Sequence, residues 1–85
     1  MSEIPSSAIQ AYHQRILELA ADKLRNAPPD KRDFSAMTLA ADPARLPQAR
    51  KMIEEFQDKL TQFLLTPHAK EVFVMSCQLF SLERK

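Results

Sequence analysis

The sequence predicts an α+β fold in which helices and strands alternate in the order α-β-α-β. Two stretches place apolar residues at the three- and four-residue steps of a helix, and two others are rich in the β-branched, aromatic and long apolar side chains typical of strands. Six prolines divide the 85 residues into these four pieces, and the chain has no glycine. We expect a single domain over residues 1–85, because a chain of this length forms one small core.

The first element is predicted as an amphipathic helix over residues 7–26. Ser7 and Gln10 have the spacing of a capping box at its start, and Asn26 shortly precedes two prolines that cannot continue it. Between these ends, one stripe recurs at helical steps and consists of Ile9, Tyr12, His13, Ile16, Ala20 and Leu24. We expect this stripe to pack against the rest of the domain.

A turn at residues 28–32 leads to a short strand predicted over residues 33–40. Met37 and Leu39 are compatible with either a helix or a strand. The β-branched Thr38 and the flanking residues, which disfavour a helix, favour a strand. A further short turn is placed at residues 43–46. If a helix began at Pro43, Pro47 would lie one full turn inside it, where its ring clashes with the carbonyl of the residue four positions earlier.

The second helix is predicted over residues 47–65, where the apolar periodicity is strongest. Its stripe consists of Ala49, Met52, Ile53, Phe56, Leu60, Phe63 and Leu64. Phe56 lies at the centre of the stripe, so we expect it in the core, against Met37, Leu39 or the final strand. Truncating a buried Phe to Ala costs about 3–5 kcal/mol, so the Ala variant of such a core residue would be largely unfolded.

The final strand is predicted over residues 72–82, a long run without proline or glycine. One face carries Phe73, Met75, Cys77 and Leu79. We expect this face to pack on the core, with Cys77 as an unreactive buried side chain. The other face, which is polar only near its middle, carries Val72, Val74, Ser76, Gln78, Phe80 and Leu82. A strand this long needs hydrogen-bonding partners along its edges as well as cover on a face.

These elements predict a right-handed βαβ unit with both helices on one face of a small sheet. Two parallel strands make a poor sheet alone, so we expect edge-to-edge pairing with a second copy to complete it. A homodimer hides both the free edge and the apolar outer face. The predicted interface consists of Val72, Val74, Ser76, Phe80 and Leu82.

Composition narrows the classes of function. The net charge of +1 provides no field to attract nucleic acid or an anionic membrane, so we expect this chain to bind neither. The chain has no membrane-span-length apolar run and its first residues lack the pattern of a signal peptide, which predicts a cytoplasmic protein. The single cysteine also fits a reducing compartment.

No catalytic or ligand-binding motif stands out. The absence of glycine argues against the usual phosphate-binding loops and nucleophile elbows. His68 and Cys77 have no metal-ligand spacing, and the adjacent carboxylates Glu54 and Glu55 point to different sides of a helix. We therefore expect no enzymatic activity, no cofactor and no metal.

Several short runs together resemble one family. They are residues 8–13, 17–20, 28–35, 37–39, 46–47, 55–56 and 78–82. In this order and spacing, the chain resembles a C-terminal domain of unknown function shared by bacterial proteins classed as transcriptional regulators, in which a winged helix-turn-helix half precedes the domain. The sequence departs from the family pattern at Phe73, Val74 and Ser81. These residues do not include the helix-turn-helix half, so the family's DNA binding is not carried over, and we expect no direct DNA binding by this chain.

The resemblance and the residues together predict a non-enzymatic regulatory and self-association domain that acts through protein–protein contacts. Its partner is a second copy or a longer paralogue. The alternative is a small-molecule effector sensor with a pocket between the first helix and the sheet, around Tyr12, His13 and Arg32. For His13 the more common role is that of a partly buried, hydrogen-bonded helix residue. For Arg32 it is a pairing with Asp33, with a helix terminus or with another subunit.

Overall fold

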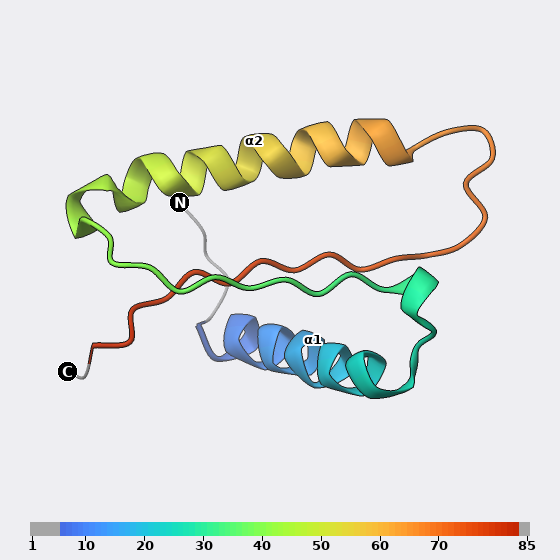
Figure 1. Cartoon of the computed structure of the whole chain (residues 1–85), viewed down its shortest axis with the longest axis horizontal. Helices are drawn as coiled ribbons and strands as arrows, with labels where there is room; N and C mark the ends of the chain where they lie inside the picture. The colour runs from blue at the N-terminus through green and yellow to red at the C-terminus, as the bar shows by residue number, and fades with distance from the viewer. Residues whose placement is uncertain (1–5, 84–85) are drawn as a thin grey trace. The chain divides into compact units, whose positions relative to one another are not determined.

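The computed structural model describes residues 6–83, in which two α-helices are the main elements (Figure 1). Helix α1 spans Ser6–Asn26 and helix α2 spans Leu46–Leu64. Two short 3-10 helices lie between them, η1 at Pro29–Lys31 and η2 at Pro43–Arg45. Both α-helices match their predicted positions to within one residue at each end.

The predicted α+β fold is wrong. The structure has no strand and no sheet among residues 6–83, so this part of the chain is helical. The stretches predicted as strands, residues 33–40 and 72–82, run as extended chain (Figure 1), and neither has a backbone hydrogen-bond partner in the part of the chain that the structure describes. Their side chains favour extended backbone, but a strand exists only where a neighbouring edge accepts its hydrogen bonds.

The chain divides into two compact units, Met1–Thr38 and Leu39–Lys85, and each is described by itself. The first holds α1, η1 and the extended residues that follow. The second holds η2, α2 and the C-terminal extended segment. The βαβ unit predicted to link the two strands is therefore absent from the described residues, while the single domain over residues 1–85 stays a prediction.

In the first unit, local hydrogen bonds close the end of α1. Asn26 Nδ2 donates to Asp22 Oδ1 at 2.8 Å, and the Ala27 amide donates to the Lys23 carbonyl at 2.9 Å. Lys23 and Arg25 lie in the last turn, where positive charge favours the helix dipole. The half-buried side chains of α1, Ile16 and Ala20, both belong to the predicted stripe.

In the second unit, the turn before α2 forms as its prolines predict. The carboxylate of Asp42 accepts a hydrogen bond from the Ala44 amide at 3.0 Å, and Pro43 opens the 3-10 turn η2. Pro47 lies in the first turn of α2, where its missing N–H costs no helical hydrogen bond. Asp42 thus acts as the cap of a continuous η2–α2 helical segment.

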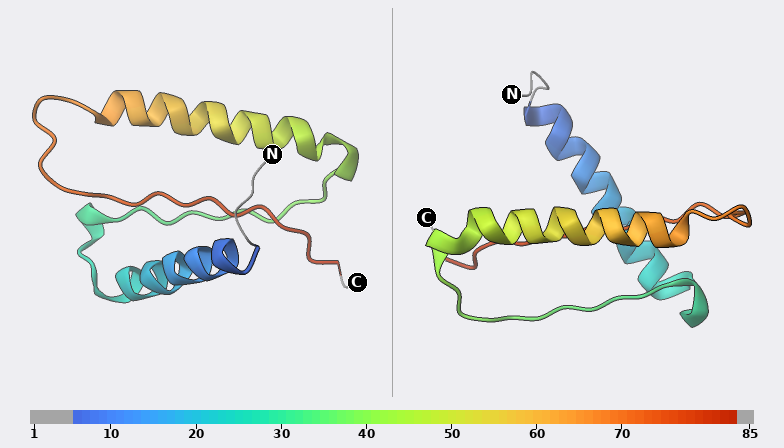
Figure 2. Two further views of the ribbon diagram at one scale, coloured as in Figure 1. Left: turned by 180° about the vertical axis from the view of Figure 1, so that it is seen from behind. Right: turned by 90° about the horizontal axis from the view of Figure 1, so that it is seen from above.

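After α2 the chain reverses. The Leu65 amide donates to the Thr61 carbonyl at 3.0 Å, and Thr66 then organises a turn by accepting from the Ala69 amide on its carbonyl and from the His68 amide on its hydroxyl. Figures 1 and 2 show residues 72–83 returning in the direction opposite to α2. The second unit is therefore a helix followed by an extended segment.

The predicted core is missing within the described residues, none of which is buried. On α2 the least exposed residues, Ala49, Ile53, Gln57 and Leu60, are only half-buried. Phe56, the expected centre of the core, is 56% exposed. Ala49, Ile53 and Leu60 belong to the predicted stripe, but Gln57 does not, and the stripe residues Met52, Phe56, Phe63 and Leu64 are exposed.

The Asp42 cap gives a first testable prediction. Asp42→Ala removes the acceptor for the Ala44 amide, and losing such a cap costs about 1 kcal/mol, which corresponds to about fivefold faster hydrogen exchange. We expect this acceleration at the amides of η2 and the first turn of α2, measured by hydrogen exchange on the whole chain.

The matched control for this cap is Asp42→Asn, which keeps a side-chain oxygen in the same position and should exchange as the parent does. Equal exchange in the Ala and Asn variants would show that the Asp42 carboxylate does not hold the start of α2.

Candidate association surface

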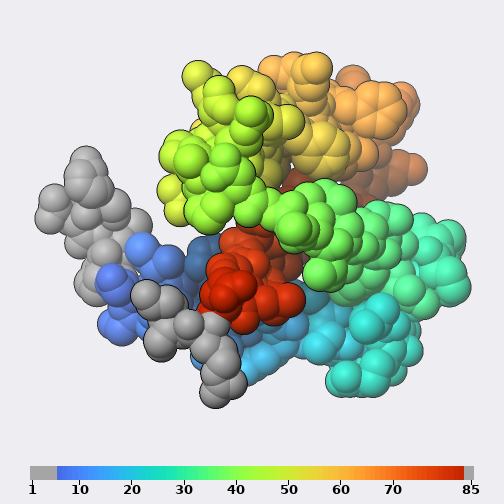
Figure 3. All heavy atoms as spheres, turned by 60° about the vertical axis from the view of Figure 1, so that its left-hand side comes forward, coloured from blue at the N-terminus to red at the C-terminus, as the bar shows by residue number. Residues whose placement is uncertain are grey.

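The C-terminal segment, defined as residues 72–82, presents large apolar side chains to solvent. Val72 is 93% exposed, Phe80 is 73% exposed and Leu82 is 77% exposed. Atoms of this segment are visible at the surface in Figure 3. All five predicted interface residues are exposed, a group made up of Val72, Val74, Ser76, Phe80 and Leu82. Soluble proteins rarely leave such a patch uncovered.

The backbone of the C-terminal segment has no backbone hydrogen-bond partner among residues 6–83. The bonds in and next to the segment are local side-chain contacts, in which Gln78 Nε2 donates to Ser76 Oγ at 2.9 Å and the Glu83 amide donates to Ser81 Oγ at 3.0 Å. Both edges of the extended chain thus carry free donors and acceptors, the arrangement that templates pairing with another strand.

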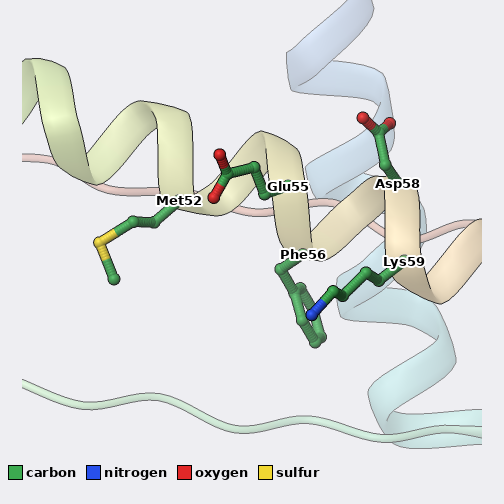
Figure 4. Close-up of a pocket in the computed structure, with 5 residues that line it drawn as sticks. All are labelled: Met52, Glu55, Phe56, Asp58 and Lys59. Carbon is green, nitrogen blue, oxygen red and sulfur yellow. The ribbon is translucent and has the colours of Figure 1, made fainter.

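A second exposed surface lies on α2 in the same unit. A shallow open groove is lined by Met52, Glu55, Phe56, Asp58 and Lys59. Figure 4 shows that the Met52, Phe56 and Lys59 side chains point to one side of the helix, whereas those of Glu55 and Asp58 point to the other. The surface is therefore an apolar stripe with charged groups along its rim, which suits a protein partner better than an enclosed small-molecule site.

The residues of the predicted effector pocket all lie in the first unit. The rings of Tyr12 and His13 meet edge to face, with centroids 5.4 Å apart, and both side chains are exposed. Arg32 is half-buried and its Nε donates to the Ala27 carbonyl at 3.2 Å. Arg32 therefore satisfies a carbonyl left free beyond the end of α1. The pocket itself stays a prediction, but the sheet expected to form one of its walls is absent from the described residues.

Cys77 is a free, exposed thiol. The expectation that it fills the core face of a strand is wrong, because the segment that carries it is uncovered. Within the described residues, no group of three side chains is placed to hold a metal ion. No helix in this part of the chain is long and apolar enough to cross a membrane.

The comparison with protein families identifies the domain. A family model described as a domain of unknown function, DUF4423, matches residues 1–82. The chain belongs to this family. No curated protein and no solved structure matches it. The DUF4423 match includes both α-helices and all of the C-terminal segment, so the uncovered segment is part of the family's domain.

The exposure of Cys77 gives a second testable prediction. An exposed thiol reacts without prior unfolding, so at low protein concentration Cys77 should react with a disulfide reagent such as DTNB at nearly the rate seen in urea. Cys77→Ser, the control, abolishes the signal. A reaction that requires denaturant would place Cys77 in a buried environment.

Proposed function

We propose that this DUF4423 chain is a non-enzymatic association domain whose extended C-terminal segment becomes a strand when a partner chain supplies the missing edge. The observation that carries the proposal is that the backbone of residues 72–82 has no backbone hydrogen-bond partner within residues 6–83. An edge of this kind pairs readily with another chain. The exposed apolar residues of the segment then provide contact area around the new hydrogen bonds.

The energetics of the segment support a partner. Ordering the backbone of these eleven residues costs roughly 11–22 kcal/mol at 1–2 kcal/mol each. Full burial of the seven large apolar side chains in the segment contributes roughly 10–20 kcal/mol. The two terms balance only when nearly all of that surface is covered. In one copy these seven side chains stay 44–93% exposed, so a second chain is needed to cover the rest.

The regulatory part of the proposal follows from the resemblance to the C-terminal halves of bacterial transcriptional regulators. A domain that self-associates can bring two regulator chains together, including this chain and a longer paralogue. In a dimer of such regulators, the association domain would hold the two DNA-reading halves together, which favours recognition of paired half-sites. We place this activity in the cytoplasm, where transcription factors of bacteria act.

A second candidate function, effector sensing, is favoured by the contact between the Tyr12 and His13 rings. Aromatic pairs of this kind can bind a ligand ring or cation. The two functions differ in what stabilises the chain. Self-association makes the melting temperature rise with protein concentration, whereas sensing makes it rise with added metabolite.

A third prediction tests self-association directly. The parent should sediment as a dimer at micromolar concentration, and Val74→Lys should dissociate it by placing a positive charge from each copy in an apolar contact. The control Gln62→Lys adds the same charge at an exposed position of α2 and should remain dimeric. Sedimentation equilibrium measures both, and a parent mass of 9.7 kDa throughout the micromolar range would refute the proposal.

A fourth prediction concerns Phe56. Because Phe56 is 56% exposed in one copy, Phe56→Ala should cost well under the about 3–5 kcal/mol of a fully buried Phe when the protein is dilute. In the dimer, where the partner covers the stripe, the cost should approach the full value. Thermal unfolding at two protein concentrations measures the difference, with Glu55→Ala as the neighbouring control. An equal cost at both concentrations would show that association leaves Phe56 uncovered.

A further inference from the structure

We infer that two copies of the C-terminal segment pair antiparallel about a two-fold axis that passes midway between the two Cys77 residues. The inference rests on the proposed self-association and assigns its register. In this register each residue lies opposite the residue at the same distance on the other side of Cys77. The occupant of the free edge is thus a second copy of this chain.

The segment is self-complementary about Cys77. On the face that holds the predicted interface, the register places Val72 opposite Leu82, Val74 opposite Phe80, and Ser76 opposite Gln78. On the other face it pairs Met75 with Leu79 and Cys77 with its symmetry mate. Apolar residues therefore meet apolar residues and the polar pair meets at the centre, with Phe73 opposite Ser81 as the one mismatch. Matched cross-strand pairs of this kind stabilise a sheet.

The polar centre also has matching hydrogen-bond groups. Within one copy, Gln78 Nε2 already donates to Ser76 Oγ at 2.9 Å. In the antiparallel pair, Gln78 of each copy lies directly opposite Ser76 of the other. The amide and hydroxyl groups can then make the same bond across the two strands, twice per dimer.

Other registers fit less well. A shift of the axis to Ser76 places Val74 opposite Gln78, and a shift to Gln78 places Ser76 opposite Phe80; both also shorten the overlap of the two segments. A slip of a single residue is excluded because it turns the apolar face of one strand to the opposite side of the sheet. The axis at Cys77 is the one that pairs the whole segment.

Charge favours a second copy as the partner and sets the limits of the pairing. Residues 72–82 carry no charged side chain, so two copies can approach along the whole segment without repulsion. The next pair outward would oppose Glu71 and Glu83, and like charges directly opposite are destabilising. A stable dimer buries roughly 1,200–2,000 Å² in total, and the exposed stripe of α2 in the same unit offers further contact area for it.

Cys77 makes the register measurable. Residues directly opposite in an antiparallel pair have Cα atoms about 4.5–5.5 Å apart, which lies within the roughly 4.4–6.8 Å that a disulfide spans. The thiol is free and exposed in the single copy. Treatment of the parent dimer with oxidised glutathione should link the two copies, as two Cys77 thiols become one disulfide and one oxidised glutathione becomes two reduced molecules.

The fifth prediction uses displaced cysteines in the full chain. In a Cys77→Ser background, one chain carries Val74→Cys and a second, size-tagged chain carries Phe80→Cys. After mixing and oxidation, non-reducing electrophoresis should show the mixed disulfide and little of either homodisulfide. In this register two copies of residue 74 lie six residues apart along the strands, or about 20 Å, which is too far for a disulfide.

The controls separate the register from association itself. The parent should lose its Cys77 cross-link in the Val74→Lys variant, which excludes random collision of exposed thiols as its source. If the protein sediments as a dimer but the displaced cysteines form homodisulfides as readily as the mixed disulfide, the register is wrong and the proposed function still stands. A species of 9.7 kDa alone overturns both.

Discussion

The constraint on which this structure depends is that a backbone N–H or C=O group can leave water only where it finds another hydrogen-bond partner. A helix meets this need from within its own few turns, whereas an extended segment must find a neighbouring edge. Helices α1 and α2 therefore form completely in one chain. Residues 72–82 take up extended backbone but acquire no such neighbour among the described residues.

The same distinction explains how much the sequence could predict. The ends of α1 and α2 were located to within one residue because proline positions and apolar stripes act locally. The turn at Pro43 followed from the position of Pro47 alone. Side-chain alternation in residues 72–82 correctly favours extended chain. It does not indicate which other segment would pair with that chain, and the α+β prediction is wrong for that reason.

For the candidate surface, the sequence located the residues but not their surroundings. Val72, Val74 and Phe80 were expected to be uncovered in a single copy, and they are exposed. Alternation separates two faces without indicating which is covered, so Cys77 was wrongly expected to be inert filling. Phe56 lies on the predicted stripe of α2 but is half-exposed, because a helical stripe predicts which side will be covered and not what covers it.

The exposed, extended segment also affects how long a lone copy survives. Proteases bind their substrates as extended chain and add it to their own sheet edges, which is the conformation that residues 72–82 already have. A copy paired with another withholds that edge. In the proposed dimer, degradation would therefore remove unpaired copies first, and pairing would set how long each copy survives.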